Sequence, residues 1–153
     1  MDTDQFKKAR GYVLRLFKLR PRSTGELKKK LQMKGYEGEI IEKIISECAM
    51  SGLLDDSAFA KAWLQSRLKK YGFRRVSREL AEKGITKELI DTVWQDARED
   101  YDEEALVRQI AERRFFSREQ KDIPLLKRKK HVMDYLARRG FNLGIINKVI
   151  RQL

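Results

Sequence analysis

The sequence predicts an all-α protein, a tandem array of three three-helix repeats that is elongated and curved. Apolar residues recur at helical spacing almost throughout, and no segment shows the alternation of a half-buried strand. A short phrase also recurs: a leucine, three residues of which the last is basic, and a glycine. Its copies are Leu31–Gly35, Leu80–Gly84 and Leu136–Gly140. An aliphatic stripe follows each glycine, and units of this size need their neighbours to bury enough apolar surface.

The recurring phrase divides the chain into repeats at residues 1–54, 55–99 and 100–153. In the first repeat, an apolar stripe over residues 6–17 predicts a helix that ends near Pro21. Ser23 and Glu26 have the spacing of a capping box at the start of the second helix. Gly35 supplies the C-cap of that helix, and a third helix carries residues 40–48. We expect the three phrase glycines to act alike.

The other repeats follow the same plan. Asp55 and Asp56 precede a helix that should end at Tyr71–Gly72, and a short helix then leads to Gly84. Thr86 caps the sixth helix. The third repeat begins after an acidic stretch; Asp122 and Pro124 open its longer middle helix, and Asn142 caps the last one. The polar residues 116–123 should form a loop, and nine helices result in all.

Composition limits the class of function. The chain has 153 residues, 35 basic and 23 acidic, and its net charge of +12 favours a polyanionic partner or an acidic protein surface over plain solubility. No apolar run has the length of a membrane span, and no signal peptide is apparent. The single cysteine, Cys48, lies in the apolar register and should be a core residue. We therefore expect a cytoplasmic monomer without membrane association.

A search for catalytic or metal-binding groups finds little. The only histidine, His131, follows a basic run and has no second ligand nearby, so it should lie on the surface. A phosphate-binding loop is absent from the sequence. Asp100 and Asp102 imitate the start of a calcium loop, but Ala105 and Ala111 stand where glycine and the bidentate glutamate are needed. We expect no enzyme activity, no metal and no cofactor.

Basic clusters are more informative. Residues 7–34 contain eleven basic residues and a single acidic one, and residues 127–130 are all basic. Residues 67–78 contain six basic residues and no acidic one, with Tyr71 and Phe73 interleaved and Gly72 breaking the helix. A helix end, a turn and a helix start would gather these charges on one edge. This edge is suited to phosphates or carboxylates, and the alternative is a solvated surface.

A helix–glycine–helix unit also suggests a DNA-reading helix-turn-helix. However, strongly apolar residues follow the turn in all three repeats, and few polar side chains that could read bases stand there. The sequence therefore disfavours sequence-specific DNA recognition. A general nucleic-acid-binding helical module without a dedicated protein partner stays open as the alternative function.

The middle of the chain resembles a known family. Five stretches resemble the central signature of the RecX regulatory proteins: residues 52–60, Arg67, residues 71–76, residues 79–80 and residues 83–85. Length, charge and the three-triplet plan extend this resemblance over the chain. It implies a non-enzymatic modulator of the RecA recombinase, concerned with DNA repair, recombination and the SOS response. Such a protein binds the RecA filament on single-stranded DNA and inhibits its ATPase and strand-exchange activities; weak direct DNA binding stays open.

Within this signature we separate structural from functional positions. Leu54, Phe59, Leu80, Gly84 and Ile85 have the character of core or cap residues. The basic residues have no such structural explanation, because unpaired charges are costly to bury. We therefore assign the partner- or DNA-binding edge to five of them: Arg67, Lys70, Arg74, Arg75 and Arg78.

Overall fold

The computed structural model describes residues 3–153, and within that range the protein is entirely helical, with no strand. Residues 3–153 form nine α-helices and two short 3₁₀ helices, and the α-helices make three triplets, so the predicted all-α class with three three-helix repeats is confirmed. The bounds are α1 (Thr3–Leu19), α2 (Thr24–Met33), α3 (Gly38–Met50), α4 (Asp56–Arg67), α5 (Phe73–Glu82), α6 (Lys87–Ala97), η1 (Arg98–Asp100), α7 (Glu103–Phe115), η2 (Arg118–Gln120), α8 (Leu125–Arg138) and α9 (Leu143–Arg151). No helix in the described range is both long and apolar enough to cross a bilayer.

The helices form two compact units, and each is described by itself. The first comprises the described residues up to Ala62 together with Leu80–Val93, and the second comprises Trp63–Glu79 and Trp94–Leu153. Both units therefore include parts of the second repeat. The repeat boundaries taken from the sequence stay predictions.

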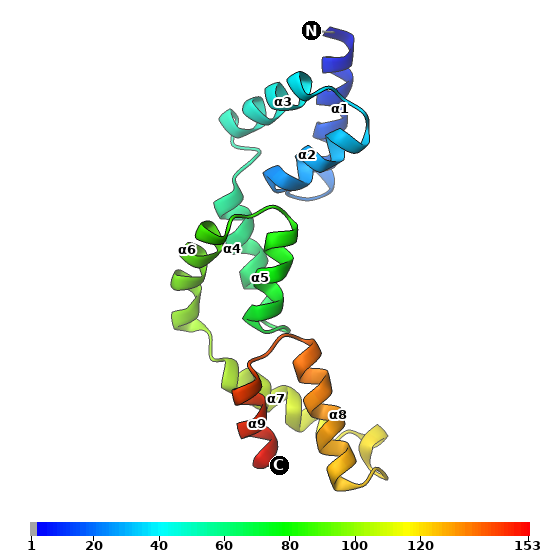
Figure 1. Cartoon of the computed structure of the whole chain (residues 1–153), viewed down its shortest axis with the longest axis vertical. Helices are drawn as coiled ribbons and strands as arrows, with labels where there is room; N and C mark the ends of the chain where they lie inside the picture. Colours follow the sequence, from blue (N-terminus) through cyan, green and yellow to red (C-terminus); the bar gives the residue numbers. More distant parts are fainter. Residues whose placement is uncertain (1–2) are drawn as a thin grey trace. The chain divides into compact units, whose positions relative to one another are not determined.

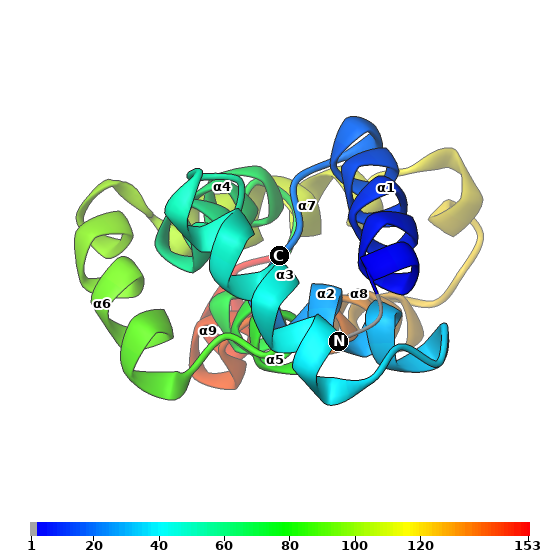
Figure 2. The same cartoon turned by 90° about the horizontal axis from the view of Figure 1, so that it is seen from above.

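The first repeat lies wholly in the first unit. In both views α3 lies beside α1 and α2 (Figure 1, Figure 2). Its core joins side chains from the three helices, namely Phe6, Ala9, Val13, Leu16, Leu27, Leu31, Ile40, Ile41, Ile44 and Cys48, with Leu54. Cys48 is thus a core residue, as predicted. The predicted capping box is also present: Ser23 accepts from the backbone of Glu26, and the Glu26 carboxylate accepts from the backbone of Ser23.

In the first unit, the start of α2 contacts the turn between α5 and α6, and we call this contact the first junction. The Ser23 hydroxyl donates to the carbonyl of Lys83 at 2.6 Å. Gly25 lies so close that a Cβ there would be 2.7 Å from the same carbonyl oxygen. Glu26 accepts from Arg20 at 3.2 Å and from Lys83 at 3.4 Å. Burial acts to raise the Glu26 pKa, but these cations and the Ser23 N–H lower it to about 2.

The second unit contains the third repeat, whose core is built from α7, α8 and α9 (Figure 1). Predicted caps are present in both units: Asp55, Thr86 and Asn142 each accept from the backbone N–H three residues later. Asp56 has a different role from the expected one, because it accepts from the N–H of Thr24 at 2.8 Å. It therefore caps the start of α2 from a distance.

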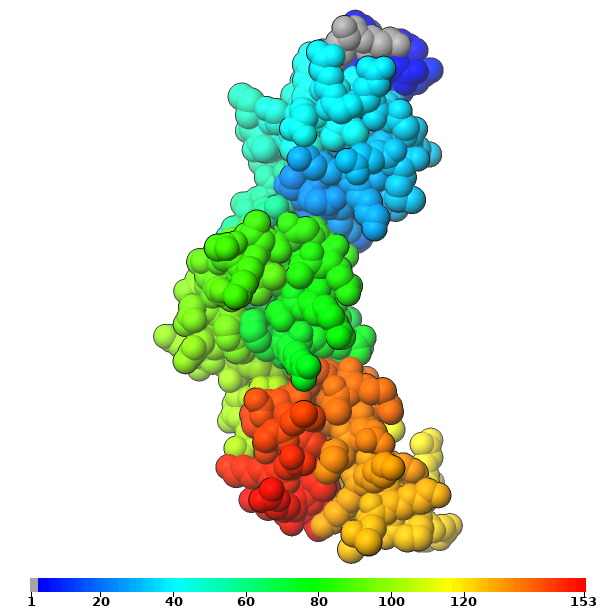
Figure 3. Space-filling model, in the orientation of Figure 1, coloured from blue at the N-terminus to red at the C-terminus, as the bar shows by residue number. Residues whose placement is uncertain are grey.

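Two boundaries differ from the sequence prediction. The α4 helix ends at Arg67 rather than at Tyr71–Gly72, because the following residues form a turn in which Lys70 and Tyr71 both donate to the Arg67 carbonyl. The expected loop over residues 116–123 contains the short helix η2. Figure 3 shows this segment, in yellow, as a projection beside α8.

Candidate interaction surface

The start of α5 in the second unit contacts the turn between α8 and α9, and we call this contact the second junction. The N–H of Gly72 donates to the carbonyl of Arg139 at 2.9 Å. A Cβ at Gly72 would overlap the carbonyl of Gly140, so this close approach requires glycine. The junction brings the end of α8 next to the predicted basic edge, which spans Arg67 to Arg78.

Tyr71 lies at the centre of this edge. The guanidinium carbons of Arg67, Arg75 and Arg139 lie 4.2, 4.1 and 4.7 Å from the centroid of its ring. Arg139 also donates to the carbonyl of Lys70 at 3.0 Å. Each arginine is attracted to the negative face of the ring, and the contact covers part of the apolar surface of Tyr71. Three cations, from α4, from α5 and from the C-cap of α8, therefore converge on one aromatic side chain.

Glu79 fixes two of these arginines. Its carboxylate accepts from Arg67 at 2.7 and 3.0 Å in a bidentate arrangement, and from Arg75 at 3.3 Å. The indole N–H of Trp63 donates to the same carboxylate at 2.9 Å. Burial acts to raise the Glu79 pKa, but the hydrogen bonds from Arg67 and Trp63 outweigh it and hold the pKa below its usual value. Glu79 thus stays ionised and keeps the arginines in place.

The other predicted residues have a different environment. The side chains of Lys70, Arg74 and Arg78 are exposed. Arg74 and Arg78 are one helical turn apart on α5, so they share a face, and this face is distinct from the one that carries Arg75 and Glu79. Arg74 also lies in the first turn of α5, which has no acidic residue. A cation at this position opposes the helix dipole.

The structure therefore divides the five predicted residues. Arg67 and Arg75 meet at Glu79 and Tyr71, whereas Lys70, Arg74 and Arg78 project into solvent at the same edge. Sequence reasoning missed the roles of Glu79 and Arg139. The role of Glu79 had a usable signal, because Arg75 and Glu79 are four residues apart in a helix. No local pattern links Arg139 to a turn about seventy residues earlier.

The calcium-like segment has no counterpart in a built site. Within residues 3–153, no three His, Cys, Asp or Glu side chains are grouped so that they could hold a metal ion. Asp102 instead accepts from the N–H of Ala105 and caps α7. Its role is that of an ordinary helix cap.

Three three-helix repeats along the chain, with arginines gathered at a junction, define a helical-repeat protein. Models of the RecX family match all three repeats. The first three-helix domain matches residues 9–48, the second matches residues 55–93, and the third matches residues 102–150. The chain belongs to the RecX family.

Curated relatives and solved structures agree with this assignment. The regulatory protein RecX of Thermobifida fusca (strain YX) is 30% identical over 151 residues, covering 97% of this chain and 80% of the relative. That of Pelodictyon phaeoclathratiforme is 34% identical over 144 residues, covering 93% and 86%. The crystal structure of RecX from Lactobacillus salivarius matches with a TM-score of 0.77 at 18% identity, covering 99% and 98%. Another crystal structure of regulatory protein RecX gives 0.79 at 22%, covering 95% and 73%. At these identities the structures show the fold alone.

Proposed function

We propose that this protein regulates the RecA recombinase by binding the RecA filament on single-stranded DNA and inhibiting its ATPase and strand-exchange activities. The proposal rests on the RecX family membership and on the resemblance described above. The relatives are named regulatory proteins, which is consistent with action through binding rather than catalysis. In this proposal the protein is a cytoplasmic monomer that needs no cofactor.

The observation that carries the proposal is the exposed pair Arg74 and Arg78 next to the Tyr71 cluster. Folding does not explain these two charges, because both side chains are exposed and Arg74 opposes the dipole of its helix. An arginine presents a planar fork that binds a carboxylate or a phosphate in a bidentate way. A filament of protein and DNA offers both groups.

The remaining residues of the edge have a supporting role in this proposal. Glu79 and Tyr71 hold Arg67 and Arg75 by charge and by stacking, so α5 starts in a fixed position. Arg74 and Arg78 are then presented from a rigid helix rather than from a loop, which lowers the conformational entropy lost on binding. Lys70 adds a further exposed cation at the same edge.

The test is an assay of the DNA-dependent ATPase of RecA with this protein titrated in. We expect the double variant Arg74→Glu with Arg78→Glu to require at least about tenfold more protein for half-inhibition, because reversed charges repel the acidic partner. Lys127→Glu with Lys130→Glu is the matched control, since it makes the same change of charge at exposed positions of α8. The control variant should raise the protein concentration needed for half-inhibition by less than the Arg74 and Arg78 double variant does. Circular dichroism should show that both variants keep their helical content.

Equal inhibition by the two double variants would contradict the assignment of this edge. Co-sedimentation with single-stranded DNA alone tests the alternative function. If the wild-type protein binds bare DNA as tightly as it binds the RecA filament, it is a general nucleic-acid-binding module. Binding to the filament should also weaken with salt, because exposed charges are screened.

A further inference from the structure

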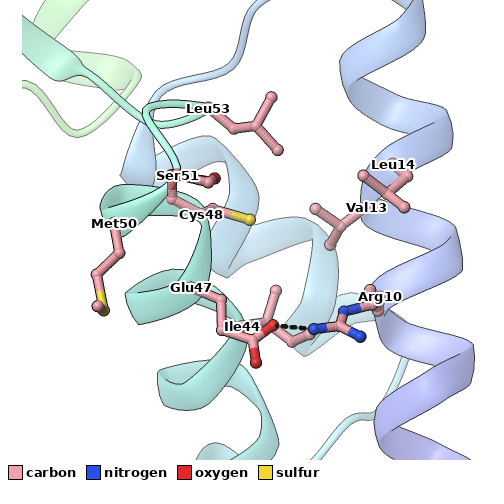
Figure 4. Close-up of a pocket in the computed structure, with 9 residues that line it drawn as sticks. All are labelled: Arg10, Val13, Leu14, Ile44, Glu47, Cys48, Met50, Ser51 and Leu53. Atoms are coloured by element: carbon pink, nitrogen blue, oxygen red, sulfur yellow. Dashed lines mark hydrogen bonds and ion pairs between the residues drawn. The ribbon is translucent and has the colours of Figure 1, made fainter.

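An apolar groove lies between α1 and α3 of the first unit. Its volume is about 480 Å³, which is in the range of ordinary binding clefts. Figure 4 shows Val13 and Leu14 on α1 facing Cys48 and Leu53 across the groove. The ion pair between Arg10 and Glu47, at 2.8 Å, closes one end. The walls are thus aliphatic, and the polar groups are at the margin.

Leu14 is the unusual residue of this groove. It follows the buried residue Val13 directly, and 47% of its surface is exposed. The equivalent positions of the other repeats, directly after buried Leu64 and Ala111, hold exposed polar residues: Gln65 and Glu112. Glu112 accordingly borders a polar depression on α7. The repeat fold therefore does not require an apolar side chain at this position, and only the first repeat has one.

The margin of the groove on α1 is basic. Lys7, Arg10 and Lys18 follow the same helical face as Leu14, at spacings of three and four residues. Lys7 and Lys18 are exposed, and Arg10 is paired with Glu47. On α3, Lys43 lies over the ring of Phe6, 4.5 Å from its centroid. An occupant of this groove thus needs an apolar side chain for the floor and acidic groups for the rim.

We propose that the α1–α3 groove is a second docking site, which takes an acidic amphipathic helix of the protein component of the filament. Helices bind grooves of this kind through apolar residues at i, i+4 and i+7. A nucleic acid fits less well, because the nine residues lining the groove include no aromatic side chain for base stacking. A membrane fits less well because the apolar residues line a concave surface. The choice of the RecA filament as the source of this helix rests on the proposed function. The preference for an acidic amphipathic helix rests on the groove alone.

A labelled peptide tests the groove without RecA. The probe is a helical peptide with leucines at i, i+4 and i+7 and glutamates at most other positions, and its binding is measured by fluorescence anisotropy. Leu14→Gln and Leu14→Glu, which carry the residues of the other repeats, should weaken binding by about tenfold. Leu19→Gln is the matched control: Leu19 is on the same helix, more exposed, and absent from the groove lining. It should change binding by less than about twofold.

The charge requirement has its own controls. Lys18→Glu should weaken peptide binding. Lys8→Glu should have a smaller effect, because Lys8 lies about a quarter-turn of the helix from the face that carries Lys7 and Lys18. A peptide of the same composition with its leucines scrambled should bind poorly. The proposal is overturned if the designed peptide does not bind, if Leu14→Glu binds it as well as the wild type, or if Leu14 matters only for vesicles of phosphatidylcholine and phosphatidylserine.

The filament is tested separately, by co-sedimentation with RecA on single-stranded DNA. Leu14→Glu should lower the bound fraction, and Leu19→Gln should not. If the wild-type protein does not bind the filament at all, the proposed function fails, and the peptide experiment still decides whether the groove is a docking site. If the wild type binds and Leu14→Glu binds equally well, the groove does not contact the filament, and this inference is wrong while the proposed function stands.

Discussion

The first junction, in the first unit, places the start of α2 against the turn at Gly84, and the second, in the second unit, places the start of α5 against the turn at Gly140. The contact at the first depends on side chains: the Ser23 hydroxyl bonds to the Lys83 carbonyl. The second uses the backbone, because the Gly72 N–H bonds to the Arg139 carbonyl. The same close approach of a helix start to a glycine turn is thus achieved in two ways.

The charges at the two junctions also differ. At the first, the Glu26 carboxylate binds Arg20 and Lys83. At the second, Glu79 binds Arg67 and Arg75, and Arg139 adds a third cation on Tyr71. The exposed arginines Arg74 and Arg78 extend this excess. The two junctions thus share a central carboxylate that binds two cations, and the proposed function assigns the exposed arginines of the second junction to a partner.

The largest expected effect separates the glycines of the turns. Gly140→Val should lower the free energy of unfolding by about 3 kcal/mol or more, because φ is +82° and a Cβ would lie 2.6 Å from the Arg75 nitrogen. Gly84→Val should lower the free energy of unfolding by less, since the atom nearest to an added Cβ there is the Gly25 Cα, at 3.0 Å. Gly35→Val adds only backbone strain, about 1 kcal/mol, because nothing lies within 4 Å. Chemical denaturation followed by circular dichroism measures the series, and equal losses would refute this order.

Acidification tests the carboxylate of the first junction. The folded-state pKa of Glu26 is about 2, below its ordinary value of 4.5, so its contribution to stability is complete above pH 4.5 and is lost as the pH falls towards 2. Glu26→Gln should cost about 2 kcal/mol at neutral pH and should flatten the pH dependence in this window. Denaturation midpoints of both proteins between pH 7 and pH 2 measure the difference. Parallel curves would show that Glu26 is not the group concerned.

Ser23→Ala should lower the free energy of unfolding by about 1 kcal/mol, because the hydroxyl both caps α2 and donates to the Lys83 carbonyl. At the second junction the helix start bonds to the turn through the backbone N–H of Gly72, so no side-chain substitution removes that bond. Ser23→Thr is the control, since it keeps the hydroxyl. If the alanine and threonine variants unfold at the same denaturant concentration, the hydroxyl does not hold this junction.

The smallest expected effect is an increase in stability. Arg74→Glu should stabilise the protein by about 0.5 kcal/mol, because it replaces a cation with an anion in the first turn of α5. The same variant should weaken inhibition of the RecA ATPase. A stabilised protein that binds less well would identify Arg74 as a residue kept for its partner. A variant that is less stable than the wild type, or that inhibits the RecA ATPase normally, would remove this argument for the basic edge.

The fold was largely predictable because its signals are local. Helical apolar spacing, the capping box at Ser23 and the caps at Asp55 and Asn142 each depend on residues a few positions apart. The three phrase glycines all have the positive φ expected of a C-cap, between +82° and +85°, but only Gly84 and Gly140 also contact another helix start. The charge of the basic edge, residues 67–78, was also visible in the sequence. Its internal pairing was not, because the contacts of Tyr71 with Arg67 and Arg139 depend on a turn and on a distant helix.

Both tryptophans of the chain lie in the second unit. Trp63 donates to Glu79, and the Trp94 ring stacks on Phe73 with the ring centroids 3.9 Å apart. Intrinsic tryptophan fluorescence therefore reports on the second unit, and unfolding of the first repeat alone would be nearly silent in that signal. Circular dichroism responds to the helices of both units. Superimposable denaturation curves from the two methods would show a single cooperative transition, and separated curves would give the stability of each unit in one experiment.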